Sequence, residues 1–211
     1  MTTTLDPVLE QSRLERWLDC VQTRLASEKE SLNALDAAIG DADHGSNLFR
    51  GFSKVQEKLQ SAPPEDIPAL FKLVGMTLIG SVGGASGPLY GTFFLETAKA
   101  LPQERKSVDL QTLAQALTAG LQGVQRLGKA EKGDKTMVDA LAPAIERLQQ
   151  GADLRAAAAA ARHGLEATVP LIARKGRASY LGERSQGHAD PGAASATLLL
   201  ECLARDDDSA A

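Results

Sequence analysis

Apolar residues recur at intervals of three and four positions along most of this chain, and this period limits its fold more than any other feature. The first set comprises Leu14, Leu18, Val21 and Leu25, which is the spacing of one face of an amphipathic helix. Residues 156–161 are all alanine, the strongest helix former. Only 4% of the residues are aromatic, and small aliphatic side chains favour helix over strand. No segment shows a convincing strand pattern, so we predict an all-α fold.

The helical pattern divides into about eight segments. They cover approximately residues 14–25, 31–38, 46–59, 66–78, 110–124, 135–149, 156–161 and 193–203, and an apolar helix is also expected after the glycine-rich segment 80–91. The glycine-rich segment 80–91 is expected to be a tight turn between packed helices, and residues 174–192 a long loop. No repeat or linker divides the chain, so residues 1–211 are expected to form one domain, with 206–211 as a frayed, solvated end.

Composition excludes several kinds of partner. The net charge is −4, so there is no basic surplus to neutralise a nucleic acid backbone. No apolar run is long enough to span a bilayer, and residues 1–11 lack the apolar core of a signal peptide. We therefore expect a soluble cytoplasmic protein without membrane contact. Cys20 and Cys202 lie beside apolar residues in helical patterns, and we expect two buried free thiols.

Three aspartates, Asp36, Asp41 and Asp43, lie close together where Gly40 and Gly45 interrupt a helical pattern. Carboxylates so close repel one another unless a cation or solvent screens them. Hard oxygen ligands suit Mg²⁺ or Ca²⁺, and Mg²⁺ is usually bound together with substrate phosphates. The cluster therefore predicts a metal–nucleotide site. The alternative is that these aspartates are turn and capping residues on a solvated loop.

The residues after the cluster, His44, Gly45, Ser46 and Asn47, open a helix whose free N–H groups can bind an anion. The loop 83–87 also precedes a helix, so its backbone N–H groups are candidates to cradle phosphate. The basic segment 174–180 is a candidate to neutralise a transferring phosphate. The alternatives are a structural histidine, a mobile glycine linker and a basic segment that only aids solubility.

Five stretches together resemble the nucleotide-binding (L) subunits of bacterial dihydroxyacetone kinases. They are IGDADHGSN (39–47), RGF (50–52), GMTLIGSVGGASGPLYGTFF (75–94), GKAEKGDKTM (128–137) and ARKGRASYLGERSQGHADPGA (173–193). The GDADHG core alone is less specific, since it is also similar to the nucleotide domain of fatty-acid kinases.

The resemblance implies a closed barrel of eight antiparallel helices with ADP or ATP and two Mg²⁺ at one end. The metal ligands would be Asp36, Asp41 and Asp43. Arg177 would be the catalytic residue. Nucleotide contacts would come from His44, Gly45, Ser46, Asn47, Ala85, Ser86, Gly128, Met137, Arg177, Asp190, Pro191 and Gly192.

The resemblance also implies partners. A K subunit would hold dihydroxyacetone, and an M subunit of the phosphotransferase system would rephosphorylate the bound ADP. Two alternatives stay open: the nucleotide subunit of an ATP-consuming kinase for another ketose or a fatty acyl group, and a non-catalytic helical metal-binding module. A homodimer also stays open.

Overall fold

The computed structural model describes residues 8–205, and within them the chain is all-α apart from two short strands. The α-helices are α1 (Gln11–Ile39), α2 (His44–Ser61), α3 (Ile67–Ser81), α4 (Ser86–Ala100), α5 (Leu110–Gly128), α6 (Val138–Gln149), α7 (Leu154–Ala167) and α8 (Pro191–Leu203). A 3-10 segment, η1, covers Arg177–Ser185, and the strands are β1 (Val8–Glu10) and β2 (Ser107–Asp109). The predicted all-α class is confirmed. The expected frayed end at 206–211 lies outside the described residues.

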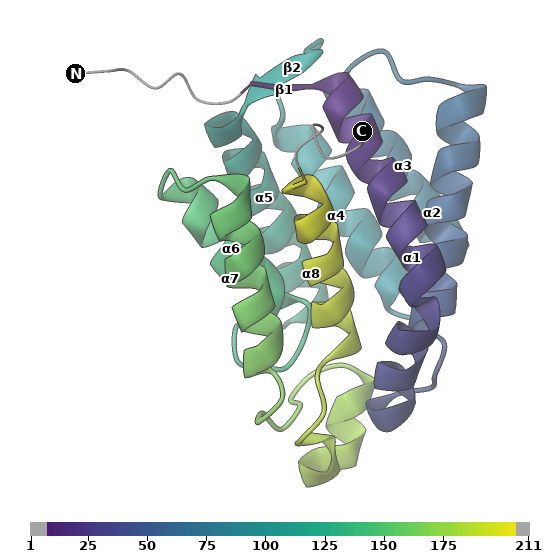
Figure 1. Ribbon diagram of the computed structural model, residues 1–211, viewed down its shortest axis with the longest axis vertical. Helices are drawn as coiled ribbons and strands as arrows, with labels where there is room; N and C mark the ends of the chain where they lie inside the picture. The colour runs from purple at the N-terminus through teal and green to yellow at the C-terminus, as the bar shows by residue number, and fades with distance from the viewer. Residues whose placement is uncertain (1–7, 206–211) are drawn as a thin grey trace.

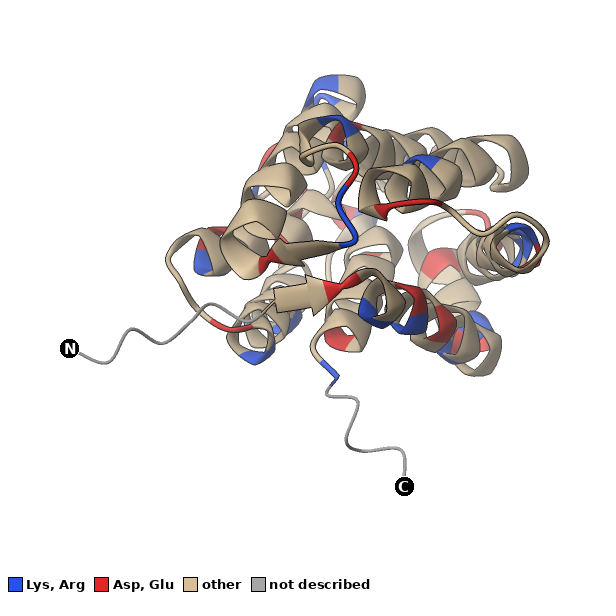
Figure 2. Cartoon of the chain, turned by 90° about the horizontal axis from the view of Figure 1, so that it is seen from above, with Lys and Arg blue, Asp and Glu red and all other residues tan. Residues whose placement is uncertain are grey.

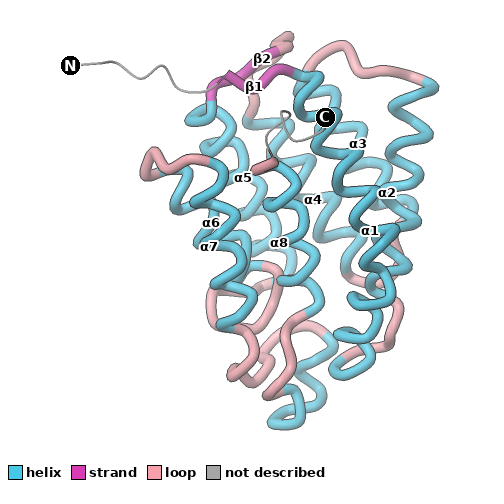
Figure 3. Tube along the Cα trace, viewed as in Figure 1, coloured by secondary structure: helices cyan, strands magenta, loops and turns pink. Residues whose placement is uncertain are grey.

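The helices run alternately in opposite directions along the long axis of the molecule (Figure 1). Each α-helix packs against the next one in sequence, and α8 also packs against α1. The connections from α1 to α2, α3 to α4, α5 to α6 and α7 to α8 therefore lie at one end, opposite the strands (Figure 3). Residues far apart in the sequence meet in these connections.

The core follows the period seen in the sequence. On α1 the residues at spacings of three and four, such as Leu14, Leu18 and Val21, are buried. Trp17 and Phe71 each lie about 6 Å from Phe94 between ring centroids, which joins α1, α3 and α4. The indole Nε1 of Trp17 donates to the backbone carbonyl of Leu199 at 2.8 Å, so α1 is tied to α8 as well.

Four expectations about secondary structure are corrected. The turn expected at 80–91 is confined to residues 82–85, because α3 runs to Ser81 and α4 begins at Ser86. The helices expected at 14–25 and 31–38 are one helix, because the polar residues between them continue it and Arg24 pairs with Glu28 one turn later. The helix expected from Lys135 begins at Val138, since Lys135 itself has a positive φ of 64°. β1 and β2, which were not expected, pair antiparallel with Leu9 opposite Val108. At three residues each they are too short to show an alternating pattern.

The expectation of two free thiols was wrong. The structure pairs Cys20 of α1 with Cys202 of α8 in a disulfide, with a Cα–Cα distance of 5.7 Å. Their 182-residue separation in sequence conceals that α8 returns to lie along α1.

Aspartates begin several of these helices. Asp66, Asp109, Asp153 and Asp190 each accept a hydrogen bond from a backbone N–H in the first turn of the following helix. Viewed from above, acidic and basic residues are interspersed over the helices (Figure 2). Among the described residues, no helix combines the length and apolar character needed to cross a membrane.

Candidate metal and nucleotide site

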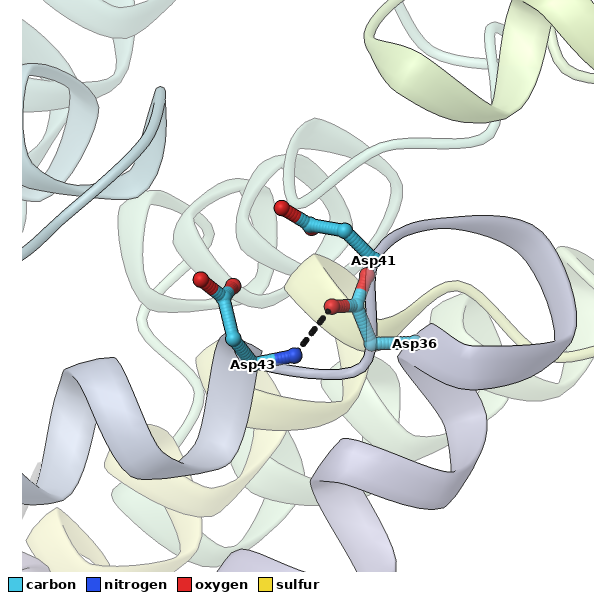
Figure 4. A group of neighbouring side chains, drawn as sticks. All are labelled: Asp36, Asp41 and Asp43. Atoms are coloured by element: carbon cyan, nitrogen blue, oxygen red, sulfur yellow. Dashed lines mark hydrogen bonds between the residues drawn. The ribbon is translucent and has the colours of Figure 1, made fainter.

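Asp36, Asp41 and Asp43 form the acid cluster, at the turn that joins α1 to α2. One carboxylate oxygen from each residue lies within 4.8 Å of the others. Figure 4 shows the side chains of Asp41 and Asp43 extending to the same side of the turn, above Asp36. The turn contains Ala42 at a positive φ of 65°, and Gly40 leaves room for the Asp36 carboxylate, with which a Cβ would clash. The local backbone therefore brings the three carboxylates together.

Asp36 also holds the start of α2. Its Oδ2 accepts hydrogen bonds from the backbone N–H of Asp43 at 3.0 Å and of His44 at 3.2 Å (Figure 4 shows the first). Asp36 is buried, whereas Asp41 and Asp43 are exposed. The cluster thus has one fixed carboxylate at its base and two accessible ones above it.

The acid cluster carries unbalanced negative charge. Partial desolvation, followed by the neighbouring carboxylate of Asp43, raises the pKa of Asp41 above its ordinary value, and the guanidinium of Arg177 opposes the rise. Arg177 Nη1 lies 2.5 Å from Asp41 Oδ2. Mutual repulsion among carboxylates with oxygen atoms this close favours the binding of a hard divalent cation.

His44 lies at the base of the site in a buried hydrogen-bond chain. Its Nε2 is 2.8 Å from Ser195 Oγ, and its Nδ1 is 3.1 Å from Ser86 Oγ. Ser195 Oγ lies 2.6 Å from Tyr90 Oη and donates to the carbonyl of Gly192. Burial lowers the pKa of His44. The imidazole therefore joins the start of α2 to α4 and α8.

A cavity of about 460 Å³ opens beside the acid cluster. Small-molecule sites are commonly about 300–1,000 Å³. Among the predicted site residues, the following line this cavity: Asp36, Asp41, Asp43, His44, Asn47, Ala85, Ser86, Gly128, Met137, Arg177, Asp190, Pro191 and Gly192. They come from four connections, α1–α2, α3–α4, α5–α6 and α7–α8, and from the helix ends beside them, which the fold gathers at one end of the molecule.

Gly45 and Ser46 do not line the cavity. Ser46 faces α1, where its Oγ and backbone N–H bond to Asn33 at 2.8 and 3.0 Å. A Cβ on Gly45 would clash with the backbone carbonyl of Lys29. Both residues fix α2 against α1. Arg174, the other arginine of the basic segment 174–180 and the alternative to Arg177 for the catalytic role, is not among the lining residues either.

The sequence analysis missed two parts of the cavity wall. One is apolar and consists of Leu89, Val124 and Leu127 from α4 and α5. The other is Lys135, which is only 1% exposed although it precedes α6 in a polar turn. Leucines in a helical pattern carry no signal that separates a cavity wall from the core.

Asp190 is a buried carboxyl at the start of α8. Its Oδ2 accepts from the backbone N–H of Ala193 at 2.7 Å, and its own N–H donates to Thr168 Oγ1 at 3.0 Å. Burial raises the pKa of Asp190 to about 7. Gly192 packs closely against the Asp190 carboxyl, because a Cβ at position 192 would lie only 3.0 Å from Asp190 Oδ2.

Comparison with known proteins gives a consistent result. The family model described as "DAK2 domain" matches residues 38–205. The chain is 48% identical over 204 residues to the "PEP-dependent dihydroxyacetone kinase, ADP-binding subunit DhaL" of Escherichia coli, with 93% of this chain and 97% of the relative covered. It is 39% identical to the "PTS-dependent dihydroxyacetone kinase, ADP-binding subunit DhaL" of Lactococcus lactis, with 95% and 96% covered.

A solved structure supports the same grouping. The dihydroxyacetone kinase of C. freundii in complex with AMP-PNP and Mg²⁺ superposes with a TM-score of 0.74 at 29% identity. The match covers 97% of this chain and 35% of that longer one. The chain belongs to the DAK2 domain family and, within it, to the ADP-binding DhaL subunits of PEP- or PTS-dependent dihydroxyacetone kinases.

Proposed function

We propose that this chain holds ADP or ATP with two Mg²⁺ and passes the terminal phosphoryl group of ATP to dihydroxyacetone carried by a K subunit. ADP would stay bound and be rephosphorylated in place by an M subunit of the phosphotransferase system. The observation that carries the proposal is the convergence of Asp36, Asp41 and Asp43 at a cavity of nucleotide size. The relatives named ADP-binding subunits, and the C. freundii kinase solved with AMP-PNP and Mg²⁺, support the same ligands.

The donor set suits magnesium. Three carboxylates with no sulfur and no imidazole among them are the oxygen ligands that Mg²⁺ prefers, and the exposure of Asp41 and Asp43 leaves room for phosphate oxygens and water. When bound, Mg²⁺ would neutralise the charge of the phosphates. We assign Asp36, Asp41 and Asp43 as its ligands.

The remaining cavity residues would bind the nucleotide. The apolar wall of Leu89, Val124 and Leu127 suits an adenine ring, with Gly128 and Met137 beside it. The backbone N–H groups at the start of α4, at Ala85 and Ser86, and of α8, at Gly192, lie where helix N-termini favour phosphate, and Pro191, which has no N–H, lines the cavity beside them. Asn47, Asp190 and His44 complete the site; we keep Gly45 and Ser46 only as residues that position His44.

Arg177 is the proposed catalytic residue. Its contact with Asp41 shows that the guanidinium reaches the acid cluster, where phosphates would lie. A planar guanidinium can bridge oxygens of a transferring phosphoryl group, whose charge redistributes in the transition state.

The overall arrangement fits a subunit that works with partners. We propose that the helices close into a barrel, because each packs on the next and α8 packs on α1. The cavity lies at the end with the connections, so a K subunit can present its substrate there and exclude water. The cytoplasmic location expected from the sequence is part of this proposal.

The second candidate function is that of a nucleotide subunit in a kinase that consumes free ATP. The "Triokinase/FMN cyclase" of Homo sapiens is 38% identical over 90% of this chain, which spans 34% of that longer protein. The close match to the PEP-dependent E. coli subunit over 97% of its length favours the M subunit as donor. Turnover with a K subunit and free ATP alone, at a rate equal to that with the M subunit, would favour the second candidate.

The binding proposal is tested by purifying the chain and measuring retained nucleotide by native mass spectrometry. We expect ADP with magnesium, and release of the ADP when EDTA is added. Nucleotide affinity that does not change when divalent metal is removed would show that the acid cluster is not the metal site.

A further inference from the structure

Lys135 is a buried cation whose partners are backbone carbonyls. Its side chain is 1% exposed, and its Nζ donates to the carbonyls of Thr168 at 2.7 Å, Leu171 at 3.2 Å and His188 at 2.5 Å. Desolvation lowers the pKa of Lys135, and the carboxylates of Asp190 and Asp139 oppose that shift. Burying an ammonium group costs free energy, so a lysine here calls for a reason beyond packing.

The three carbonyls occupy particular places in the chain. Thr168 directly follows α7, whereas Leu171 and His188 are the two ends of the segment 171–188, which we call the arginine loop because it carries Arg177. One ammonium group therefore holds both ends of the loop and joins them to the end of α7. Three donors on a single rotatable group make this possible, and no neutral side chain offers the same.

Neighbouring contacts reinforce the anchor at the ends of the arginine loop. The backbone N–H of Arg174 donates to the carbonyl of Asp134 at 3.1 Å, directly beside Lys135. The N–H of Gly187 donates to the carbonyl of Val169 at 2.8 Å. Both contacts lie near the points that Lys135 holds.

The middle of the arginine loop has little core of its own. Ala173 and Ala178 pack with Ile39 in a small cluster apart from the main core, next to the acid cluster, whereas Arg177 and Tyr180 are exposed. Inside the loop, the backbone N–H of Ala173 also donates to the buried Ser185 Oγ at 2.9 Å. The position of the Arg177 guanidinium opposite Asp41 therefore relies on these few contacts and on how the ends of the loop are held.

We propose that Lys135 is a positioning residue that holds the arginine loop closed and so places Arg177 at the acid cluster. The proposal rests on the function proposed for Arg177. Lys135 itself need not touch substrate, and its effect on phosphoryl transfer is exerted through the loop.

The test compares Lys135→Met with Lys132→Met. Methionine keeps most of the apolar stem but removes the three donors, while Lys132 lies in the same turn, is exposed and pairs with Glu146. We measure limited digestion by trypsin at Arg174, Lys175, Arg177 and Arg184, then ADP affinity, and then the rate of transfer with K subunit present.

For Lys135→Met we expect faster cleavage within the arginine loop, a transfer rate lower by roughly 10²-fold, and a smaller change in ADP affinity. Lys132→Met should match the unsubstituted chain in all three. A lower melting temperature together with unchanged loop cleavage and an unchanged transfer rate would mean that Lys135 only stabilises the fold, and would overturn the proposal.

A second variant and the digestion measurement distinguish failure of the Lys135 proposal from failure of the proposed function. Should Lys135→Met fail to fold, the same measurements on Lys135→Gln decide, since glutamine keeps N–H donors without a buried charge. Absence of transfer by the unsubstituted chain with the K subunit present would count against the proposed function, whereas the digestion result would still decide whether Lys135 holds the loop.

Discussion

Asp36 differs from the other members of the acid cluster because it caps α2 in addition to serving as a proposed metal ligand. Replacing Asp36 by alanine should remove both contributions, with a stability loss of about 1 kcal/mol, typical of a lost helix cap. Asp41→Ala and Asp43→Ala should change stability by less than about 0.5 kcal/mol, since both residues are exposed and Asp43 makes no side-chain cap hydrogen bond.

All three variants should lose Mg²⁺-dependent ADP binding, measured by calorimetry. Thermal denaturation supplies the stability comparison. Equal stability losses for Asp36→Ala and Asp41→Ala, with ADP binding intact, would show that the cluster is only a structural turn.

Arg177 and Arg174 are three residues apart, yet only Arg177 lines the cavity. Arg177→Ala should lower phosphoryl transfer by roughly 10³-fold or more while changing ADP affinity far less, because the guanidinium acts on charge that redistributes during transfer. Arg174→Ala is the matched control and should keep most activity. An equal fall in ADP affinity and in rate would mean that Arg177 only anchors bound nucleotide.

Asp190 gives the stability of the chain a pH dependence. Its pKa is raised to about 7 in the folded chain, against 3.8 as its ordinary value, so its contribution is complete below about pH 4 and is lost as the pH rises through 7. Asp190→Asn removes this titration and keeps an oxygen to cap α8. Without added nucleotide, the melting temperature of the variant relative to the unsubstituted chain should rise between pH 5 and pH 8. The same difference at both pH values would contradict the burial of a titrating carboxyl.

The sequence alone identified some residues of this site and missed others, and the difference has physical reasons. Asp36, Asp41 and Asp43 could be found because they lie close together in the sequence, beside glycines that interrupt a helical pattern. Lys135 could not, since its three carbonyl partners lie 33 to 53 positions away and only the fold brings them together. Gly45 and Ser46 belong to the same motif as His44, but a helix turns successive residues to different sides, so those two face α1.

At the scale of elements, the disulfide joins the first and last helices. Reduction, or Cys20→Ser, should lower stability by about 2–5 kcal/mol, because the bond closes a long loop of 182 residues in the unfolded chain. ADP affinity should not change, since Cys20 lies roughly 24 Å along α1 from Asp36 at 1.5 Å per residue. Melting curves with and without reductant provide the measurement. A loss of ADP binding on reduction would show that the α1–α8 contact controls the site.

The sequence predicted where most helices lie, but it did not predict which helices pack against each other. The apolar period placed most helices, but it gave no reason to join 14–25 with 31–38, and it could not show that α8 returns to α1. The strands escaped prediction because pairing between Leu9 and Val108 depends on chain segments about a hundred residues apart.

At the scale of the whole molecule, the fold gathers four connections around the cavity beside the acid cluster. Our proposal assigns most of the residues that line this cavity to the metal, the nucleotide or phosphoryl transfer by Arg177, and it assigns dihydroxyacetone to another subunit. The chain alone should therefore phosphorylate nothing.

The central claim is tested most directly by a transfer assay. The chain is charged with Mg²⁺ and ATP, mixed with dihydroxyacetone, and assayed for dihydroxyacetone phosphate before and after a K subunit is added. The account predicts product only after the addition. Product formed by this chain alone, or none formed once the K subunit is present, would contradict the proposed division of labour.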